Sequence, residues 1–198
     1  ALKINTTGQQ NVAVGANALD ANTTGEGNTA LGMNSLTANT TASLNTAIGL
    51  DALAANTTGA DNVAIGVGAL DANTTAANNT AVGRDALGAN TTASYNSAFG
   101  SQALASNTTG SQNVSMGFRS MQDNTTGAEN VAIGYNALSA HTTGEGSTAI
   151  GQAALENNTT GSNNTALGKS ALFANTTGTR NIAIGNRTLD ACDTEDDN

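Results

Sequence analysis

Residues 56–72 read N-T-T-G-A-D-N-V-A-I-G-V-G-A-L-D-A, and this pattern recurs every 17 residues along the chain. The triplet Asn-Thr-Thr opens ten units and His141-Thr-Thr opens one, with no insertion or deletion between them. Four residues precede the eleven units and seven follow them, which accounts for all 198 residues. A fixed period of this length is typical of solenoids, in which each unit is one coil that stacks on its neighbours. The sequence therefore predicts a single array over residues 1–191 and an acidic C-terminal end over residues 192–198.

The columns of the repeat separate constant positions from variable ones, counting positions 1–17 from the Asn of Asn-Thr-Thr. Position 15 is Leu in every unit except for Met121, position 11 is always Gly, and position 9 is Ala except for Ser115. Positions 5, 6, 12, 13 and 16 have no fixed chemistry, which predicts that they face solvent. Position 10 is always a sizeable apolar residue, namely Val14, Leu31, Ile48, Ile65, Val82, Phe99, Met116, Ile133, Ile150, Leu167 or Ile184.

The segment N-T/V-A-I-G predicts a short strand, because β-branched residues alternate and Gly ends the run. Alternation places positions 8 and 10 on one face and position 9 on the other. We expect positions 8 and 10 to line the coil interior, and the small Ala at position 9 to approach another chain. Gly at position 11 indicates a positive φ or a close backbone approach, whereas the Gly at position 4 is replaced by Ala in three units, so this corner is not expected to need a left-handed residue. For A-L-x-A, a second strand is favoured over a helical turn.

Asn at positions 1 and 7 predicts two stacked columns, in which each amide bonds to its neighbours along the array. His141 falls in the first column, and we expect its imidazole to substitute for an amide in the stack. The ten Asn-Thr-Thr triplets are formal glycosylation acceptors. Because glycans on every coil would crowd one edge at a spacing of ~4.8 Å, the triplets are interpreted as part of the Asn column instead.

The composition of the chain excludes several classes of function and partner. The chain has no Pro, no Trp, 3% aromatic and 11% charged residues, with a net charge of −9. The negative charge disfavours a nucleic-acid partner, and no apolar run approaches the ~18 residues that span a bilayer. The single Cys192 has no partner within the chain and is either free or links chains. The chain begins without Met or a signal peptide, so we expect a mature or trimmed segment.

The segments Asn62-Val63-Ala64-Ile65-Gly66 and Asn130-Val131-Ala132-Ile133-Gly134 resemble the head repeats of trimeric autotransporter adhesins. They are also similar to N-T-A-I-G arrays in phage tail-fibre-like and other bacterial surface proteins, although the autotransporter unit is typically shorter. The resemblance implies a homotrimer of parallel β-coils, extracellular or on a virion, that acts as a stalk or in attachment. The predicted fold is thus an all-β parallel β-solenoid (β-roll or β-prism) with one coil per repeat, in a homotrimeric fibre.

The residues predict no catalytic, cofactor-binding or metal-binding site, and the chain is not expected to be an enzyme. Asp193, Glu195, Asp196 and Asp197 are interpreted as a frayed acidic tail rather than as a cation site. The alternative function is ice binding through the unbroken Thr columns at positions 2 and 3. If N-T-T were a strand, however, its two Thr residues would face opposite ways and leave one outward row. We also expect the array to stack end to end or to continue into a longer fibre, because solenoid ends expose unpaired strand edges.

Overall fold

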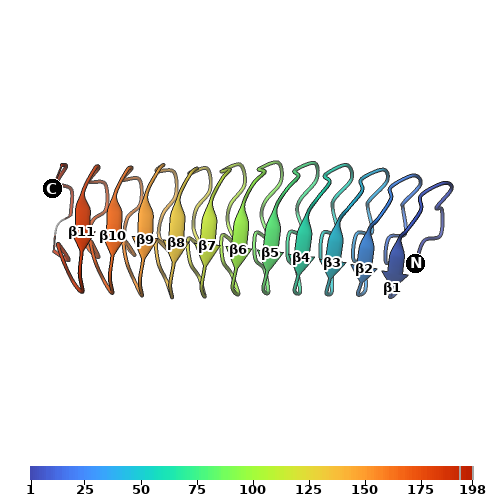
Figure 1. The fold of residues 1–198 in the computed structure, drawn as a ribbon, viewed down its shortest axis with the longest axis horizontal. Coiled ribbons are helices and arrows are strands. Elements are labelled where there is room, and N and C mark those ends of the chain that lie inside the picture. The colour runs from blue at the N-terminus through green and yellow to red at the C-terminus, as the bar shows by residue number, and fades with distance from the viewer. Residues whose placement is uncertain (192, 198) are drawn as a thin grey trace.

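The computed structural model describes residues 1–191 and 193–197. Within them the chain winds into a stack of coils in which every unit contributes one three-residue strand (Figure 1). The strands are β1 (Val12–Val14), β2 (Thr29–Leu31), β3 (Thr46–Ile48), β4 (Val63–Ile65), β5 (Thr80–Val82), β6 (Ser97–Phe99), β7 (Val114–Met116), β8 (Val131–Ile133), β9 (Thr148–Ile150), β10 (Thr165–Leu167) and β11 (Ile182–Ile184).

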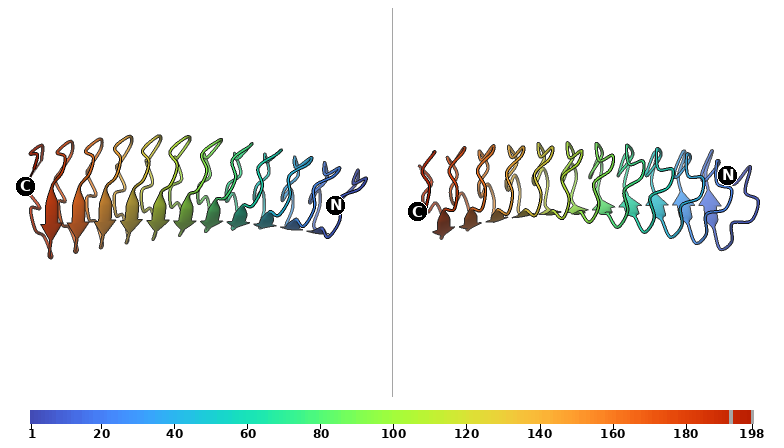
Figure 2. Two further views of the ribbon diagram at one scale, coloured as in Figure 1. Left: turned by 45° about the horizontal axis from the view of Figure 1, so that its top comes forward. Right: turned by 90° about the horizontal axis from the view of Figure 1, so that it is seen from above.

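All eleven strands form one parallel sheet in sequential order, and each residue pairs with the residue 17 positions later. Ala64, for example, pairs with Ala47 on one side and with Ala81 on the other. The strands follow one long side of the stack, and the loops complete each coil on the other side (Figure 2). The described residues contain no helix. This arrangement confirms the predicted parallel β-solenoid with one 17-residue coil per repeat.

The coil interior differs from the expectation, because the two faces of the strand are exchanged. Ala64 at position 9 is fully buried, whereas Ile65 at position 10 is 36% exposed. Across the coil, the Ser115 hydroxyl at position 9 donates to the carbonyl of Ser120 at position 14 over 2.7 Å. Positions 9 and 14 therefore face one another inside the coil. The prediction that position 10 is interior, and that the Ala column faces a neighbouring chain, was wrong.

The reason for the exchange is the space that the rest of the coil leaves. Leu70 at position 15 is fully buried, as are both Asn columns, represented by Asn56 and Asn62. These groups fill the interior opposite the strand, so position 9 holds only a small side chain, Ala or, at residue 115, Ser. The larger apolar side chains at position 10, and the Val, Ile, Thr or Ser side chains at position 8, are directed outward.

The A-L-x-A segment is a chain reversal and forms neither the expected strand nor a helix. Leu70 has a φ of 52°, and the corresponding Leu residues of the other units have nearly the same value. A left-handed conformation costs about 1–2 kcal/mol for a residue other than Gly, a cost that burial of the Leu side chain offsets. The backbone N–H of Asn73 donates to the backbone carbonyl of Leu70 over 3.1 Å and closes the reversal.

The Gly at position 11 has the role that the sequence predicts. Gly49 has a φ of 135°, and a Cβ at this position would lie 2.5 Å from the carbonyl oxygen of Gly66 in the next coil. A side chain would therefore separate the coils. At position 4, neither Gly59 nor Ala42 has a positive φ, which confirms that this corner does not require a left-handed residue.

Candidate functional surfaces

The outer side of the sheet carries an uncharged and largely apolar surface, which we call the aliphatic face and define as positions 8 and 10 of the eleven units. Position 10 is apolar in every unit, whereas position 8 is Val or Ile in five units and Thr or Ser in six. Neither position holds a charged residue in any unit. At position 10 the exposed fraction is highest at the two ends, with 55% at Val14 and 66% at Ile184, and it is 36% at Ile65 and 44% at Leu167 between them. Eleven strands of three residues give an area of roughly 50 Å by 10 Å from standard sheet spacings. An uncharged patch of this size is at the upper end of what monomers expose.

Two internal columns of Asn hold the coils together, as the sequence predicts. At position 1, the Asn73 Nδ2 group donates to Asn56 Oδ1 in the preceding coil over 2.9 Å and to the carbonyl of Ala76 in its own coil over 3.1 Å. At position 7, Asn62 Oδ1 accepts from the backbone amide of Asn79 over 3.0 Å. Burial explains why these Asn side chains are structural and are not available as glycan acceptors.

His141 lies in the position 1 column, fully buried as expected. Its Nε2 lies 2.8 Å from the Gly144 carbonyl, and its Nδ1 lies 3.1 Å from Asn158 Nδ2. These contacts assign a neutral ring with the proton on Nε2, and burial lowers the pKa of His141. An imidazole in this tautomer has no second donor for the preceding coil. Asn124 Oδ1 is consequently buried without a hydrogen-bond partner.

The two Thr columns both reach the surface, which corrects the expectation that only one does. N-T-T is a bend rather than a strand, so Thr57 at position 2 is half-buried and Thr58 at position 3 is exposed. The Thr57 hydroxyl donates to the carbonyl of Thr74 over 3.0 Å, and all other position 2 hydroxyls bond in the same manner. Position 2 is thus constant for a structural reason.

An aromatic cluster interrupts the periodic surface. The rings of Phe118 and Tyr135, both at position 12, are stacked with centroids 5.6 Å apart. The Arg119 guanidinium lies 5.0 Å from the Phe118 centroid, and its Nε donates to Gln102 Oε1 over 3.0 Å. The sequence interpretation missed this cluster because the two rings are 17 residues apart. The signal that could have found it is two aromatic residues in one column of consecutive units.

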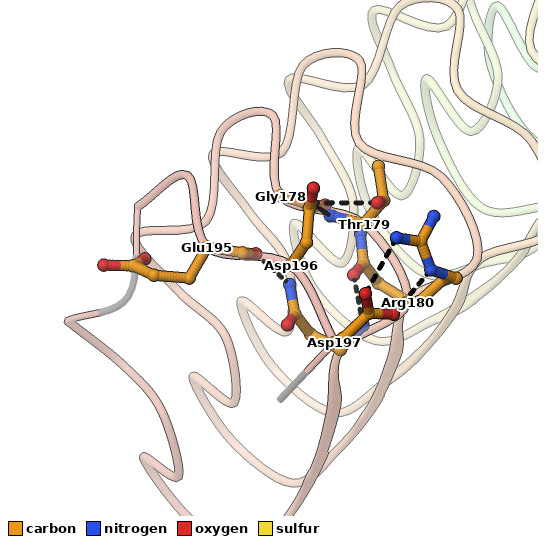
Figure 3. Close-up of polar contacts among 8 residues, drawn as sticks. Gly178, Thr179, Arg180, Glu195, Asp196 and Asp197 are labelled. Carbon is orange, nitrogen blue, oxygen red and sulfur yellow. Dashed lines mark hydrogen bonds and ion pairs between the residues drawn. The ribbon is translucent and has the colours of Figure 1, made fainter.

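The acidic residues at the C-terminal end bond to the last complete coil instead of fraying (Figure 3). Asp196 Oδ1 accepts from the backbone amide and the hydroxyl of Thr179 over 2.6 and 2.8 Å. These bonds lower the pKa of the Asp196 carboxyl. Asp197 forms a bidentate pair with Arg180 over 2.5 and 2.9 Å. The expectation of a frayed tail was therefore wrong for residues 193–197, while the state of Cys192 lies outside the described residues.

A shallow depression of about 430 Å³ lies beside the last two complete coils. Arg187 at its edge is paired with Asp190 over 2.9 Å. Residues 1–191 and 193–197 contain no group of three or more His, Cys, Asp or Glu side chains placed to hold a metal ion. The depression is lined by Lys169, Ser170, Phe173, Asn186, Arg187 and Asp190.

The structure thus defines a parallel β-solenoid with 17-residue coils. Comparison with protein-family models, with curated proteins and with solved structures finds no match. In the part of the chain that the structure describes, no helix is long and apolar enough to cross a membrane.

Proposed function

We propose that the chain is a non-enzymatic structural rod that assembles side by side with further copies of itself through the aliphatic face. The observation that carries this proposal is the column of outward-facing apolar side chains at position 10, flanked at position 8 by Val, Ile, Thr and Ser without any charge. A single chain leaves this surface in water, and burying it would stabilise the assembly by about 25 cal/mol for each Å² of apolar area covered. Another copy in parallel register offers the same inter-strand spacing along the whole face, which an unrelated globular partner does not.

The proposed stoichiometry is three, as in the trimeric head repeats that the sequence resembles. Three coils with their sheets directed at a common axis would each cover the aliphatic faces of the other two. Position 10, together with the Val and Ile residues of position 8, would then form a second apolar core between chains, in addition to the core within each coil. This arrangement assigns a role to the apolar residues that the coil interior excludes.

Mass in solution tests the assembly. Light scattering at micromolar concentration is expected to give about three times the chain mass of 19.5 kDa. Replacing both Ile65 and Ile133 by Asp should reduce the mass to that of one chain, because charges would be buried in the interface. The matched control replaces Asn78 and Gln112 by Asp, since these residues are exposed at position 6. A wild-type monomer, or Ile variants that retain the wild-type mass, would contradict the proposal, and a dimer would contradict the stoichiometry.

We further propose that the rod lies outside the cell or on a virion, as a stalk or in attachment. The resemblance to surface-protein repeats supports this location. The dense ladder of hydrogen bonds between coils supports a rigid spacer, because each coil is tied to the next at several positions. Antibody labelling of intact cells or particles of the source should detect the chain without permeabilisation, and labelling only after permeabilisation would count against the location.

Ice binding is the second candidate, and the position 3 Thr column favours it. Thr58 and the equivalent residues are exposed in all eleven units, and no hydrogen bond of their hydroxyls occurs within the described residues. A regular row of free hydroxyl and methyl groups could order water. Thermal hysteresis that Thr75→Tyr abolishes and Asn78→Tyr preserves would support this function. Hysteresis equal to that of an inert protein would exclude it.

A further inference from the structure

The aromatic cluster at coils 7 and 8 combines two exposed, stacked rings with a cation that lies over one of them. Phe118 is 39% and Tyr135 is 53% exposed. Phe118 has Arg119 over it and Tyr135 stacked on it, while the next residue in the column beyond Tyr135 is Gln152. Tyr135 therefore ends the stack and contributes an aromatic surface that no further ring covers.

Arg119 differs from most cations of the rod because no carboxylate is paired with it in the described residues. Lys3, Arg84, Arg180 and Arg187 each have an Asp within 4 Å. The Arg119 guanidinium is instead held against the Phe118 ring and tethered by Gln102. Its terminal amino groups have no bonding partner among the described residues, and such a fork matches the geometry of a carboxylate.

The two columns that hold the cluster are otherwise uncharged at its level, although the whole chain is acidic. Positions 12 and 13 of coils 6 to 9 contain no Asp or Glu, and the carboxylate that reaches them, that of Glu156 at position 16, accepts from Asn136 over 3.3 Å rather than from Arg119. The nearest neighbours in its own column are Gln102 and Asn136, which are neutral. The residues at positions 12 and 13 of these four coils are Ser101, Gln102, Phe118, Arg119, Tyr135, Asn136, Gln152 and Ala153.

We propose that Phe118, Arg119 and Tyr135 form a binding site for an acidic saccharide, a pyranose that carries a carboxylate. The carboxylate binds the terminal amino groups of Arg119, and the apolar C–H face of the sugar ring packs on Tyr135. Gln102 and Gln152 flank these groups and supply amides for hydroxyl groups. The site goes beyond the proposed assembly and is separate from it, because the Gly117 corner lies between the aliphatic face and position 12.

The test compares saccharides that differ in charge. Isothermal titration of the full chain with oligogalacturonate, alginate oligomers and sialyllactose should show binding of at least one of them. The neutral counterpart of the bound saccharide, either its methyl ester or lactose, should bind about tenfold or more weakly, since a charge-assisted bidentate contact is lost. Higher salt should weaken the binding.

Variants locate the site. Arg119→Gln and Tyr135→Ala should each reduce affinity about tenfold or more, whereas the control Arg84→Gln, which removes an exposed cation at position 12 of coil 5, should leave it unchanged. Binding of none of the three saccharides, equal binding of the neutral forms, or full affinity in Arg119→Gln would overturn the proposal. Light scattering on the same samples separates this result from the assembly, because neither site variant should alter the mass.

Discussion

His141→Asn is expected to stabilise the protein, because the wild-type imidazole interrupts the position 1 column. In the other coils, one amide group bonds both to the preceding Asn and to its own turn, as Asn124 does with Asn107 Oδ1 over 2.8 Å and with Gly127 O over 3.0 Å. An Asn at position 141 would donate to Asn124 Oδ1, which is now buried without a partner. Satisfying such an acceptor is worth about 1–3 kcal/mol.

The same substitution removes a pH dependence. Burial lowers the pKa of His141 in the folded state, so the unfolded chain binds more protons at acid pH. The stability of the wild type is then complete above the unfolded value of about 6.5 and is lost progressively as the pH falls below it. Protonation at Nδ1 would also oppose the donor of Asn158. The variant lacks this group, so its advantage should be larger at pH 5 than at pH 7.5.

Thermal unfolding at both pH values measures the effect. We expect an increase of roughly 2–4 °C for each kcal/mol in a chain of this size, together with slower amide exchange in coils 7 to 9. The reciprocal variant Asn90→His places the same interruption in coil 6 and should be less stable than the wild type. If His141→Asn gave no increase, or if Asn90→His were neutral, the proposed account of the column would be wrong.

Three further predictions follow from the coil geometry. Gly49→Ala should lower the melting temperature by several degrees because of its φ of 135° and the nearby Gly66 carbonyl. Gly88→Ala at position 16, where an added Cβ would meet nothing nearer than 3.4 Å and where Ala occurs in two other units, should have a much smaller effect. Expression in a glycosylating host should leave the position 1 acceptors such as Asn56 unmodified, since they are fully buried, whereas the exposed N-x-T sites at Asn78, Asn157, Asn163 and Asn186 stay open to modification; a glycopeptide that maps to Asn56 would contradict the burial. Thr179 bonds hold the pKa of Asp196 below its usual value of 3.8, so the attachment of residues 193–197 should persist above pH 3.8 and be lost below it, as amide exchange of these residues would show.

The sequence was sufficient to predict the features that depend on the period. The 17-residue spacing predicted the parallel register of Ala47, Ala64 and Ala81, and the constancy of Asn predicted both internal columns. Gly at position 11 was also predictable, because a constant Gly in a repeat reports on the backbone. Each of these features follows from one residue type at one position, without knowledge of what lies opposite to it.

The features that were not predictable depend on which side chains lie across the coil or in the neighbouring coil. Whether Ala64 or Ile65 faces inward depends on the space that Leu70 and the Asn columns leave, and strand alternation alone does not contain this information. The left-handed Leu70 was unexpected because local preference disfavours that conformation, and only its burial in the finished coil offsets the cost. The contact between Phe118 and Tyr135 likewise follows from the stacking of coils.

The constant separation of paired residues has a consequence for how the chain folds. Parallel sheets usually form slowly, since distant segments must meet before any contact is gained. Here each strand pairs with the strand 17 residues away in a chain of 198, which corresponds to a relative contact order of roughly 0.09, within the range of helical bundles. Two adjacent coils can therefore nucleate anywhere, and further coils add at either end. During synthesis, the first coils can stack before the last have left the ribosome.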